Sequence, residues 1–167
     1  NKNIVLIGMP GSGKSTVGKA LARKYEVDFC DTDDLIIENT GESLQDTLDR
    51  LGRDGFLEEE RQALLGYTPS KPQVIATGGS VVLHDDAMQH LKSIGTVIFL
   101  DADLPLIKKR LWNIDTRGIV FNSNEDDVIG VYREREPLYY KYSDARVHIR
   151  GKRIANIIDA IDAIVEK

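Results

Sequence analysis

The segment Gly8–Thr16, GMPGSGKST, constrains the fold more than any other part of the chain. It follows the apolar run Ile4–Ile7, which has the character of a buried strand, and it opens a helical pattern. Its Gly-x-x-x-x-Gly-Lys-Ser spacing in that setting is typical of a phosphate-binding P-loop. Glycines allow successive N–H groups to turn toward phosphate oxygens, and the helix that follows adds its partial positive charge. We therefore predict nucleotide binding, in preference to a glycine-rich turn with an incidental lysine.

The P-loop pattern predicts a role for each polar group of the segment. Lys14 is expected to reach the β- and γ-phosphates of a bound nucleotide and to act in catalysis, and the Ser15 hydroxyl to ligate Mg²⁺. The other nucleotide contacts predicted in this loop are Gly11, Ser12, Gly13 and Thr16. The P-loop alone does not separate GTPases, ATPase motors and metabolite kinases.

Strand-like apolar runs alternate with helical patterns along the whole chain. The predicted strands are Asn3–Ile7, Val27–Asp31, Gln73–Ala76, Thr96–Leu100 and Arg146–Ile149. The predicted helices are Lys14–Tyr25, Asp34–Asn39, Ser43–Leu51, Arg53–Leu65, Asp85–Ile94, Pro105–Trp112 and Ile154–Val165. Near-continuous apolar strands favour a parallel sheet covered on both faces. The sequence therefore predicts a single α/β domain over residues 1–167, with three layers.

Composition narrows the function classes. A formal net charge of −5 argues against a general nucleic-acid binder. The single cysteine, Cys30, cannot form an internal disulfide, and no apolar run reaches the length of a membrane span. We expect a cytoplasmic protein without nucleic-acid or membrane partners.

Acidic side chains follow the second predicted strand in the sequence DTDD, Asp31–Asp34. Ligands of open α/β sheets bind outside the carboxyl ends of the strands, so this position suits a functional site. Asp31 and Asp33 alternate along an extended segment, which allows one to approach the metal and the other the acceptor. A helix N-cap is an equally good interpretation of an aspartate at a strand-to-helix turn.

Two further segments are expected near the same edge of the sheet. ATGGS, Ala76–Ser80, follows the third strand and offers close backbone approach to a ligand. The polar stretch Asn113–Asp127 is long for a loop of a compact domain, and arginines in and after it suit a lid that closes over phosphates. These arginines are Arg117, Arg133 and Arg135, and each could instead be a solvated surface residue. The run Glu58–Glu60 is interpreted as a solvated helix face.

Together these segments resemble the shikimate kinase family over essentially the whole chain. The resemblance rests on GMPGSGKSTVGKALA at Gly8–Ala22, DTD at Asp31–Asp33, ATGGS at Ala76–Ser80 and REPLYYKYSD at Arg135–Asp144. It implies a P-loop NTPase fold with a five-stranded parallel sheet, an acceptor-binding subdomain at about 33–62 and a mobile lid at about 113–127. It also implies transfer of the γ-phosphoryl group of ATP, with Mg²⁺, to the 3-hydroxyl of shikimate in aromatic amino-acid biosynthesis.

The resemblance assigns roles by position. Asp31 would support the metal through water, and Asp33 would contact the acceptor hydroxyls and serve as the base. On the acceptor side, Gly78 and Gly79 match the family's glycine turn and Arg135 the arginine that grips the substrate carboxylate. On the nucleotide side, the matching residues are the lid arginine Arg117 and, in the adenine-side loop, Arg150 and Lys152.

The chain departs from the family pattern at positions that bear on the acceptor. The family has Phe-Arg-x-x-Glu, whose arginine binds the shikimate carboxylate, whereas Phe56 is followed here by Leu57. Glu60 matches the glutamate of this pattern and is a candidate to orient an arginine. The third glycine of the acceptor turn is Ser80, and the lid reads TRGIV in place of arginine followed by proline. Losing one charge-assisted hydrogen bond weakens a carboxylate ligand by roughly tenfold to a hundredfold. Arg53 and Arg61 lie four residues either side of Leu57 and are both candidates to replace the missing arginine.

The sequence therefore leaves three candidate functions. The first is a monomeric shikimate kinase. The second is a kinase of the same mechanism for another small hydroxy acid or polyol, which Leu57 motivates. The third is a non-catalytic ATP-binding module, which the presence of Lys14, Ser15, Asp31 and Asp33 disfavours.

Overall fold

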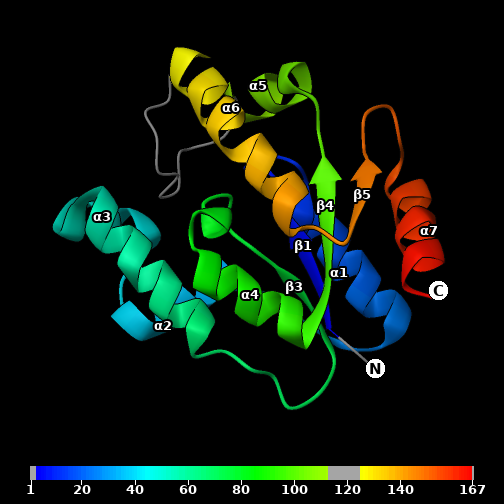
Figure 1. The fold of residues 1–167 in the computed structure, drawn as a ribbon, viewed down its shortest axis with the longest axis horizontal. Coiled ribbons are helices and arrows are strands. Elements are labelled where there is room, and N and C mark those ends of the chain that lie inside the picture. Colours follow the sequence, from blue (N-terminus) through cyan, green and yellow to red (C-terminus); the bar gives the residue numbers. More distant parts are fainter. Residues whose placement is uncertain (1–2, 113–124, 167) are drawn as a thin grey trace.

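The computed structural model describes residues 3–112 and 125–166. Its centre is a five-stranded sheet in the order β2-β3-β1-β4-β5, in which all neighbouring strands run parallel (Figure 1). The strands are β1 (Asn3–Ile7), β2 (Asp28–Asp31), β3 (Gln73–Ala76), β4 (Gly95–Asp101) and β5 (Ala145–His148). The predicted five-stranded parallel sheet is confirmed.

Helices cover both faces of this sheet. They are α1 (Lys14–Tyr25), α2 (Thr32–Thr40), α3 (Leu44–Leu65), α4 (Asp85–Ile94), α5 (Leu104–Trp112), α6 (Glu125–Tyr142) and α7 (Ile154–Val165), with a 3₁₀ turn, η1 (Val81–Leu83). The pair α1 and α7 packs together on one side, whereas α4 and α6 lie across the other (Figure 1). The three-layer α/β/α architecture is therefore as expected from the alternation of elements.

The main core explains the apolar runs of the sequence. All five residues of β1 are buried, and so are all but one of the residues of β4. These two strands pair in register from Asn3 opposite Gly95 to Ile7 opposite Phe99. Burial on both faces removes the need for alternating polar residues, which is why these segments read as continuous apolar runs.

Helices α2 and α3 have a small core of their own. Ile36, Phe56 and Ala63 are buried together, apart from the main cluster. Four leucines pack against them: Leu35, Leu44, Leu48 and Leu57. This separate packing agrees with an acceptor-binding subdomain at about 33–62, a division that stays a prediction.

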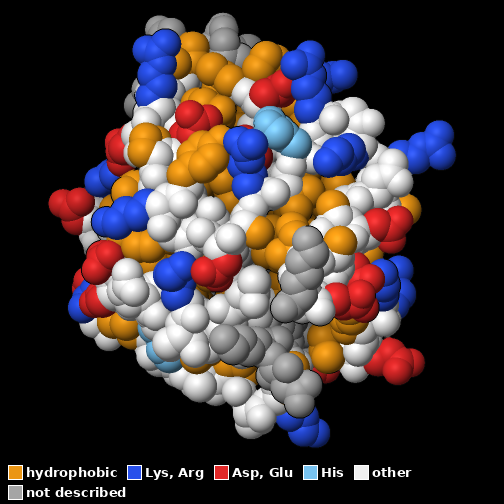
Figure 2. Space-filling view, turned by 45° about the vertical axis from the view of Figure 1, so that its right-hand side comes forward, with side chains coloured by type: hydrophobic (Ala, Val, Ile, Leu, Met, Phe, Trp, Pro, Cys, Tyr) orange, Lys and Arg blue, Asp and Glu red, His pale blue; other side chains and the backbone are white. Residues whose placement is uncertain are grey.

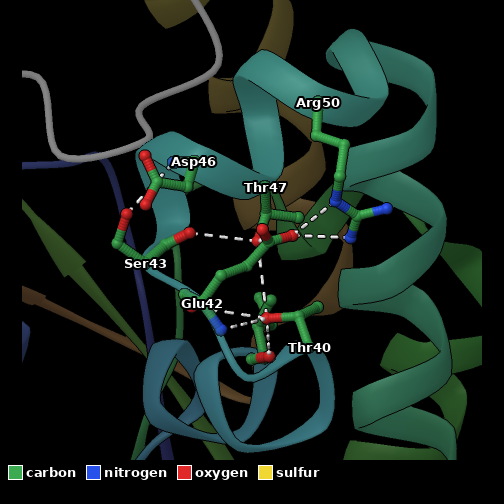
Figure 3. A network of polar contacts seen from close by, with 7 residues as sticks. Thr40, Glu42, Ser43, Asp46, Thr47 and Arg50 are labelled. Carbon is green, nitrogen blue, oxygen red and sulfur yellow. Dashed lines mark hydrogen bonds and ion pairs between the residues drawn. The ribbon is translucent and has the colours of Figure 1, made fainter.

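Helix α3 is broken at Gly52, which has φ 72° and ψ −178°. This conformation is essentially restricted to glycine, so the break predicted near Gly52 is confirmed. Before the break, a network of polar contacts joins α3 to the turn after α2 (Figure 3). Glu42 accepts hydrogen bonds from Thr47 Oγ1 at 3.2 Å and from Arg50 Nε at 2.8 Å. The network anchors the first half of α3. The kink at Gly52 separates it from the second half, which begins at Arg53.

Most element boundaries differ from prediction by one or two residues. Helix α6 begins at Glu125, so the last three residues of the stretch predicted as a loop, Asn113–Asp127, are helical. Helix α2 begins at Thr32, before the predicted Asp34, because the Asp31 side chain caps it by accepting a hydrogen bond from the Asp33 N–H at 3.0 Å. Strand β2 starts at Asp28, and β5 runs one residue earlier than predicted at both ends.

The surface carries both signs of charge. On the face shown in Figure 2, acidic and basic side chains are interspersed and neither sign dominates. Within the described residues, no helix is both long and apolar enough to span a membrane.

Candidate active site

The P-loop joins β1 to α1 at the carboxyl edge of the sheet. Gly11 and Gly13 have φ values of 82° and 92°, in the left-handed region that favours glycine. Gly8 is required for a different reason, since a β-carbon there would lie 2.7 Å from the Leu100 carbonyl oxygen on β4. The loop therefore wraps closely over the end of the sheet, as the motif predicts.

Lys14 is buried at the start of α1 and turns back into the loop. Its Nζ donates hydrogen bonds to the carbonyl oxygens of Gly8 at 2.7 Å and Met9 at 2.8 Å. Burial lowers the pKa of Lys14 to about 8, although the carboxylates of Asp33 and Asp31 act in the opposite direction. The lysine head is thus held inside the loop on carbonyl oxygens that a phosphate oxygen can replace as acceptor.

Ser15 and Asp31 meet at the junction of the P-loop and β2. Ser15 Oγ donates a hydrogen bond to Asp31 Oδ2 at 3.0 Å, while Asp31 Oδ1 caps α2. The N-cap interpretation of Asp31 is therefore confirmed, whereas its role at a metal ion stays a prediction. An alcohol and a carboxylate side by side are oxygen ligands of the kind that Mg²⁺ prefers. In the described residues, no group of three or more His, Cys, Asp or Glu side chains could hold a metal ion by itself.

Asp33 lies in the first turn of α2, beside the glycine turn after β3. A β-carbon on Gly78 would lie 3.1 Å from Asp33 Oδ1, a tight contact, so this carboxylate lies directly against the glycine. Burial raises the pKa of Asp33 to about 7, with the nearby carboxylates of Asp31 and Glu60 acting in the same direction. A carboxyl group with a pKa near 7 is suited to accept a proton at neutral pH.

The prediction that Glu58–Glu60 is a solvated helix face is wrong for Glu60, which is only 1% exposed. Ser80 Oγ donates to its carboxylate at 2.8 Å, and His84 Nε2 lies 3.0 Å from Oε1. Its other oxygen, Oε2, would lie 3.1 Å from a β-carbon on Gly78. Sequence reasoning missed this cluster, and the only signal for it was the family's glutamate, which Glu60 matches.

Arg135 is also buried, at 2% exposed, so the interpretation of this arginine as a solvated surface residue is wrong. Its Nε has no hydrogen-bond partner among the described residues, an uncommon state for a buried polar atom. The guanidinium is near enough to lower the pKa of Lys14 and of Tyr139, against the larger effect of burial on the tyrosine. Arg135 therefore presents unsatisfied donor capacity in the same region as Lys14.

Gly79 ties the acceptor-side turn to the P-loop. A β-carbon at Gly79 would lie 2.5 Å from Cδ of Pro10, and Tyr139 on α6 donates a hydrogen bond to the Gly79 carbonyl at 2.7 Å. The turn after β3 is thus held between the P-loop and α6. The tyrosine acts here through packing and one backbone contact.

The remaining predicted residues lie apart from this cluster. Arg150 and Lys152 follow β5 and are exposed, and Arg150 pairs with Asp103 at 2.9 Å. Thr16 is exposed in the first turn of α1. Arg117 and the greater part of the predicted lid, 113–124, lie outside the described residues.

Comparison with known proteins identifies the family. The model of the family described as "Shikimate kinase" matches residues 10–166. A shikimate kinase of Thermodesulfovibrio yellowstonii is 40% identical over 141 residues, covering 84% of this chain and 82% of that protein. One of Paracidovorax citrulli is 37% identical over 163 residues, covering 95% of this chain and 89% of that protein. The chain belongs to the shikimate kinase family.

Solved structures of shikimate kinases have the same fold. The enzyme from Bacteroides thetaiotaomicron superimposes with a TM-score of 0.86 at 27% identity, covering 99% of both chains. The enzyme from Acinetobacter baumannii, solved in complex with shikimate, has a TM-score of 0.85 at 26% identity, covering 98% of this chain and 92% of that one. The P-loop NTPase fold predicted from the sequence is confirmed.

Leu57 stands where the resemblance to the family expects an arginine. Three residues later on α3, Glu60 has Ser80 and His84 as its partners. Ser80 is the other acceptor-side position at which the chain departs from the expected pattern, and its hydroxyl satisfies the buried carboxylate of Glu60.

Proposed function

We propose that this protein is a shikimate kinase, which transfers the γ-phosphoryl group of ATP to the 3-hydroxyl of shikimate. The observation that carries the proposal is the position of Asp33, whose carboxylate lies beside Gly78 and Glu60 at the carboxyl edge of the sheet. The P-loop lies on one side of this carboxylate, and the negative charge of Asp33 acts to raise the pKa of Lys14, against the larger effect of burial. The family relationship supports the choice of acceptor.

Lys14 and the P-loop fit the triphosphate of ATP. In the structure Lys14 Nζ is satisfied by the carbonyl oxygens of Gly8 and Met9. Phosphate oxygens are stronger acceptors for an ammonium than carbonyl oxygens are, so binding of ATP favours an exchange of partners. The backbone N–H groups of the loop and the start of α1 add further positive potential.

Ser15 and Asp31 are the residues suited to hold Mg²⁺, together with phosphate oxygens of the nucleotide. When bound, the ion supplies positive charge that offsets the negative charge of the phosphates. Asp31 also fixes the N-terminus of α2 by capping the Asp33 N–H, so the same side chain orients the base.

Asp33 is the residue suited to act on the acceptor hydroxyl. The hydroxyl oxygen forms a bond to the γ-phosphorus, the bond from that phosphorus to the bridging oxygen of ADP breaks, and the hydroxyl proton passes to the Asp33 carboxylate. Arg135, buried and with an unpartnered Nε, is the residue suited to bind an anionic part of the acceptor. The roles of the predicted site residues thus form one consistent reaction.

The acceptor is a small molecule, and we propose that the protein acts as a cytoplasmic monomer without nucleic-acid or membrane partners. The formal net charge of −5 supports this part of the proposal, because nucleic-acid binders generally carry a basic surface.

A second candidate acceptor is another small hydroxy acid or a polyol. The observation that favours it is Leu57, which offers no positive charge where the family has arginine. The catalytic residues would be unchanged, and only the groups of the acceptor that face α3 would differ.

Steady-state release of ADP tests the proposal, measured with MgATP and shikimate and beside a panel of other small hydroxy acids and polyols. The proposal predicts saturable turnover with shikimate and a kcat/KM for shikimate above that for each other compound. Higher kcat/KM with another acceptor would support the second candidate. The absence of turnover with every acceptor would support a non-catalytic module. Lys14→Met is the control for contaminating kinases.

A further inference from the structure

We infer that Arg53 binds the carboxylate of the acceptor, in the role that Leu57 cannot fill. The inference rests on the proposed function and adds a specificity-determining residue to it. It concerns the half of α3 that follows the break at Gly52.

Leu57 is excluded from anion binding by both its chemistry and its packing. It has no polar group, and its side chain packs against the small core formed by Ile36, Phe56 and Ala63. The position therefore contributes apolar surface to the acceptor side. On this wall of the acceptor side, a positive charge in addition to that of Arg135 must therefore come from a neighbour of Leu57.

Arg53 and Leu57 lie one helical turn apart and line the same pocket. The pocket has a volume of about 360 Å³, and Leu83, His84 and Glu134 also line it. Residues four apart on a helix are neighbours on its surface. The Arg53 guanidinium therefore projects from the same wall of the pocket as the leucine that replaces the family's arginine.

Arg53 is available for a ligand. Its side chain is 53% exposed, and its ion pair in the described residues joins Nη1 to Asp54 Oδ1 at 3.8 Å, longer than a hydrogen bond. Asp54 is itself 99% exposed, so this contact is weak and easily exchanged. A carboxylate ligand can offer the bidentate geometry that Asp54 does not.

Arg61, the other candidate at equal spacing, is already occupied. Its Nη2 and Nε lie 2.6 Å and 2.9 Å from Asp86 Oδ2, and its Nη1 donates to Glu58 at 2.9 Å. These contacts hold Arg61 toward α4. The structure thus separates two arginines that the sequence leaves equivalent.

The pocket is connected to Asp33 through His84, Glu60 and Gly78. His84 lines the pocket and lies 3.0 Å from Glu60, whose other carboxylate oxygen flanks Gly78 opposite Asp33. An acceptor whose hydroxyl meets Asp33 can thus extend toward α3.

Three acidic residues line the pocket together with Arg53: Asp54, Glu58 and Glu134. Glu58 is already paired with Arg61 and accepts a hydrogen bond from Gln62 at 2.9 Å, and Asp54 is 99% exposed. With this acidic lining, a carboxylate ligand depends on the guanidinium of Arg53, so the loss of Arg53 should weaken its binding strongly.

The test compares Arg53→Ala with Arg61→Ala as the matched control, using shikimate and its methyl ester as acceptors. We expect Arg53→Ala to raise KM for shikimate by roughly tenfold to a hundredfold, with little change in KM for ATP. Arg61→Ala leaves KM for shikimate within about threefold of the wild type. Arg53→Lys recovers part of the loss, because lysine keeps the charge without the planar fork. The methyl ester, which lacks the negative charge, has the same KM with the wild type and with Arg53→Ala.

An unchanged KM for shikimate in Arg53→Ala would overturn the inference while leaving the proposed function in place. An equal rise in KM for the acid and for the ester would also overturn it, because a carboxylate contact cannot act on the ester. Absence of turnover with shikimate in the wild type would instead overturn the proposed function, and this inference with it. Circular dichroism of each variant checks that its fold is intact.

Discussion

Asp33 and Glu60 approach the same point from different helices. A β-carbon on Gly78 would lie 3.1 Å from Asp33 Oδ1 and 3.1 Å from Glu60 Oε2, so both carboxylates border the space that this glycine leaves free. Two buried carboxylates so near each other disfavour simultaneous ionisation. Ser80 and His84 supply the hydrogen-bonding partners of Glu60. Burial raises the pKa of Asp33 to about 7, and the carboxylates of Asp31 and Glu60 act in the same direction.

Glu60→Gln is predicted to change the pH dependence of turnover. The negative charge of Glu60 raises the pKa of Asp33, so removing it lowers that pKa. If Asp33 acts as the base, kcat/KM for the acceptor falls as the pH drops below about 7 in the wild type. In the variant this acid limb moves to lower pH. Profiles of kcat/KM from pH 5 to 9 measure it, and Glu59→Gln, next to it on α3, is the control expected to leave the limb in place. An acid limb at the same pH in Glu60→Gln and in the wild type would show that Glu60 does not act on the base.

Asp33→Asn is predicted to abolish turnover and to stabilise the fold. The native pKa of Asp33 is about 7 against an ordinary 3.8, so between these values the native state holds a proton that the unfolded chain has released. Stability therefore falls as the pH rises through this window, and asparagine avoids the loss. We expect the free energy of unfolding of the variant to exceed that of the wild type by roughly 1–3 kcal/mol at pH 8. The difference shrinks as the pH falls toward 4.

Urea unfolding at pH 8 and pH 5 measures this difference. A variant that is no more stable than the wild type at pH 8 would contradict a costly buried charge at Asp33. The difference at each pH is compared between proteins in the same buffer, so that other titrating groups cancel.

Nucleotide binding is predicted to take up protons above pH 8. The pKa of Lys14 is about 8 in the structure, and the negative phosphates of ATP raise it by stabilising the ammonium. Titration calorimetry at pH 8.5, in two buffers of different ionisation enthalpy, should show uptake of a fraction of a proton for each nucleotide bound. Lys14→Met is the control, which should bind the nucleotide more weakly and take up no proton at this position. Equal apparent enthalpies in the two buffers with the wild type would refute the coupling.

Gly79→Ala is predicted to disturb both substrates. The added methyl group would lie 2.5 Å from Pro10 in the P-loop, and the rigid proline ring cannot turn away. We expect a loss of roughly 1–3 kcal/mol in unfolding free energy and higher KM values for ATP and for the acceptor. Gly130→Ala on α6 is the matched control, because a β-carbon there meets nothing within 4 Å. That change should be neutral or slightly stabilising. Unchanged kinetics in Gly79→Ala would show that the turn and the P-loop are not coupled.

The features that the sequence predicted well are those formed by contiguous residues. The P-loop is one uninterrupted motif, so Lys14 and Ser15 could be assigned from spacing alone. The five strands could be recognised because burial on both faces leaves continuous apolar runs. Asp31 was left between two interpretations: Oδ1 caps α2 as one of them predicts, while Oδ2 accepts a hydrogen bond from Ser15 and the metal role stays a prediction.

Burial of charged residues could not be predicted in the same way. Three consecutive glutamates indicate a solvated helix face, yet Glu60 turns inward because Ser80 and His84, 20 and 24 positions away, supply its hydrogen-bonding partners. Arg53 and Arg61 are equivalent in spacing, and only the distant Asp86 distinguishes them by pairing with Arg61. Such partners become neighbours only through the packing of α3 against the rest of the fold.

The most direct test of the proposed function is the product formed from shikimate and MgATP by the wild-type protein, analysed by phosphorus and proton NMR. The proposal predicts one phosphorylated product, with the phosphorus coupled to the proton on carbon 3 of shikimate. A product phosphorylated at another hydroxyl, or unchanged shikimate after prolonged incubation with active MgATP, would contradict it.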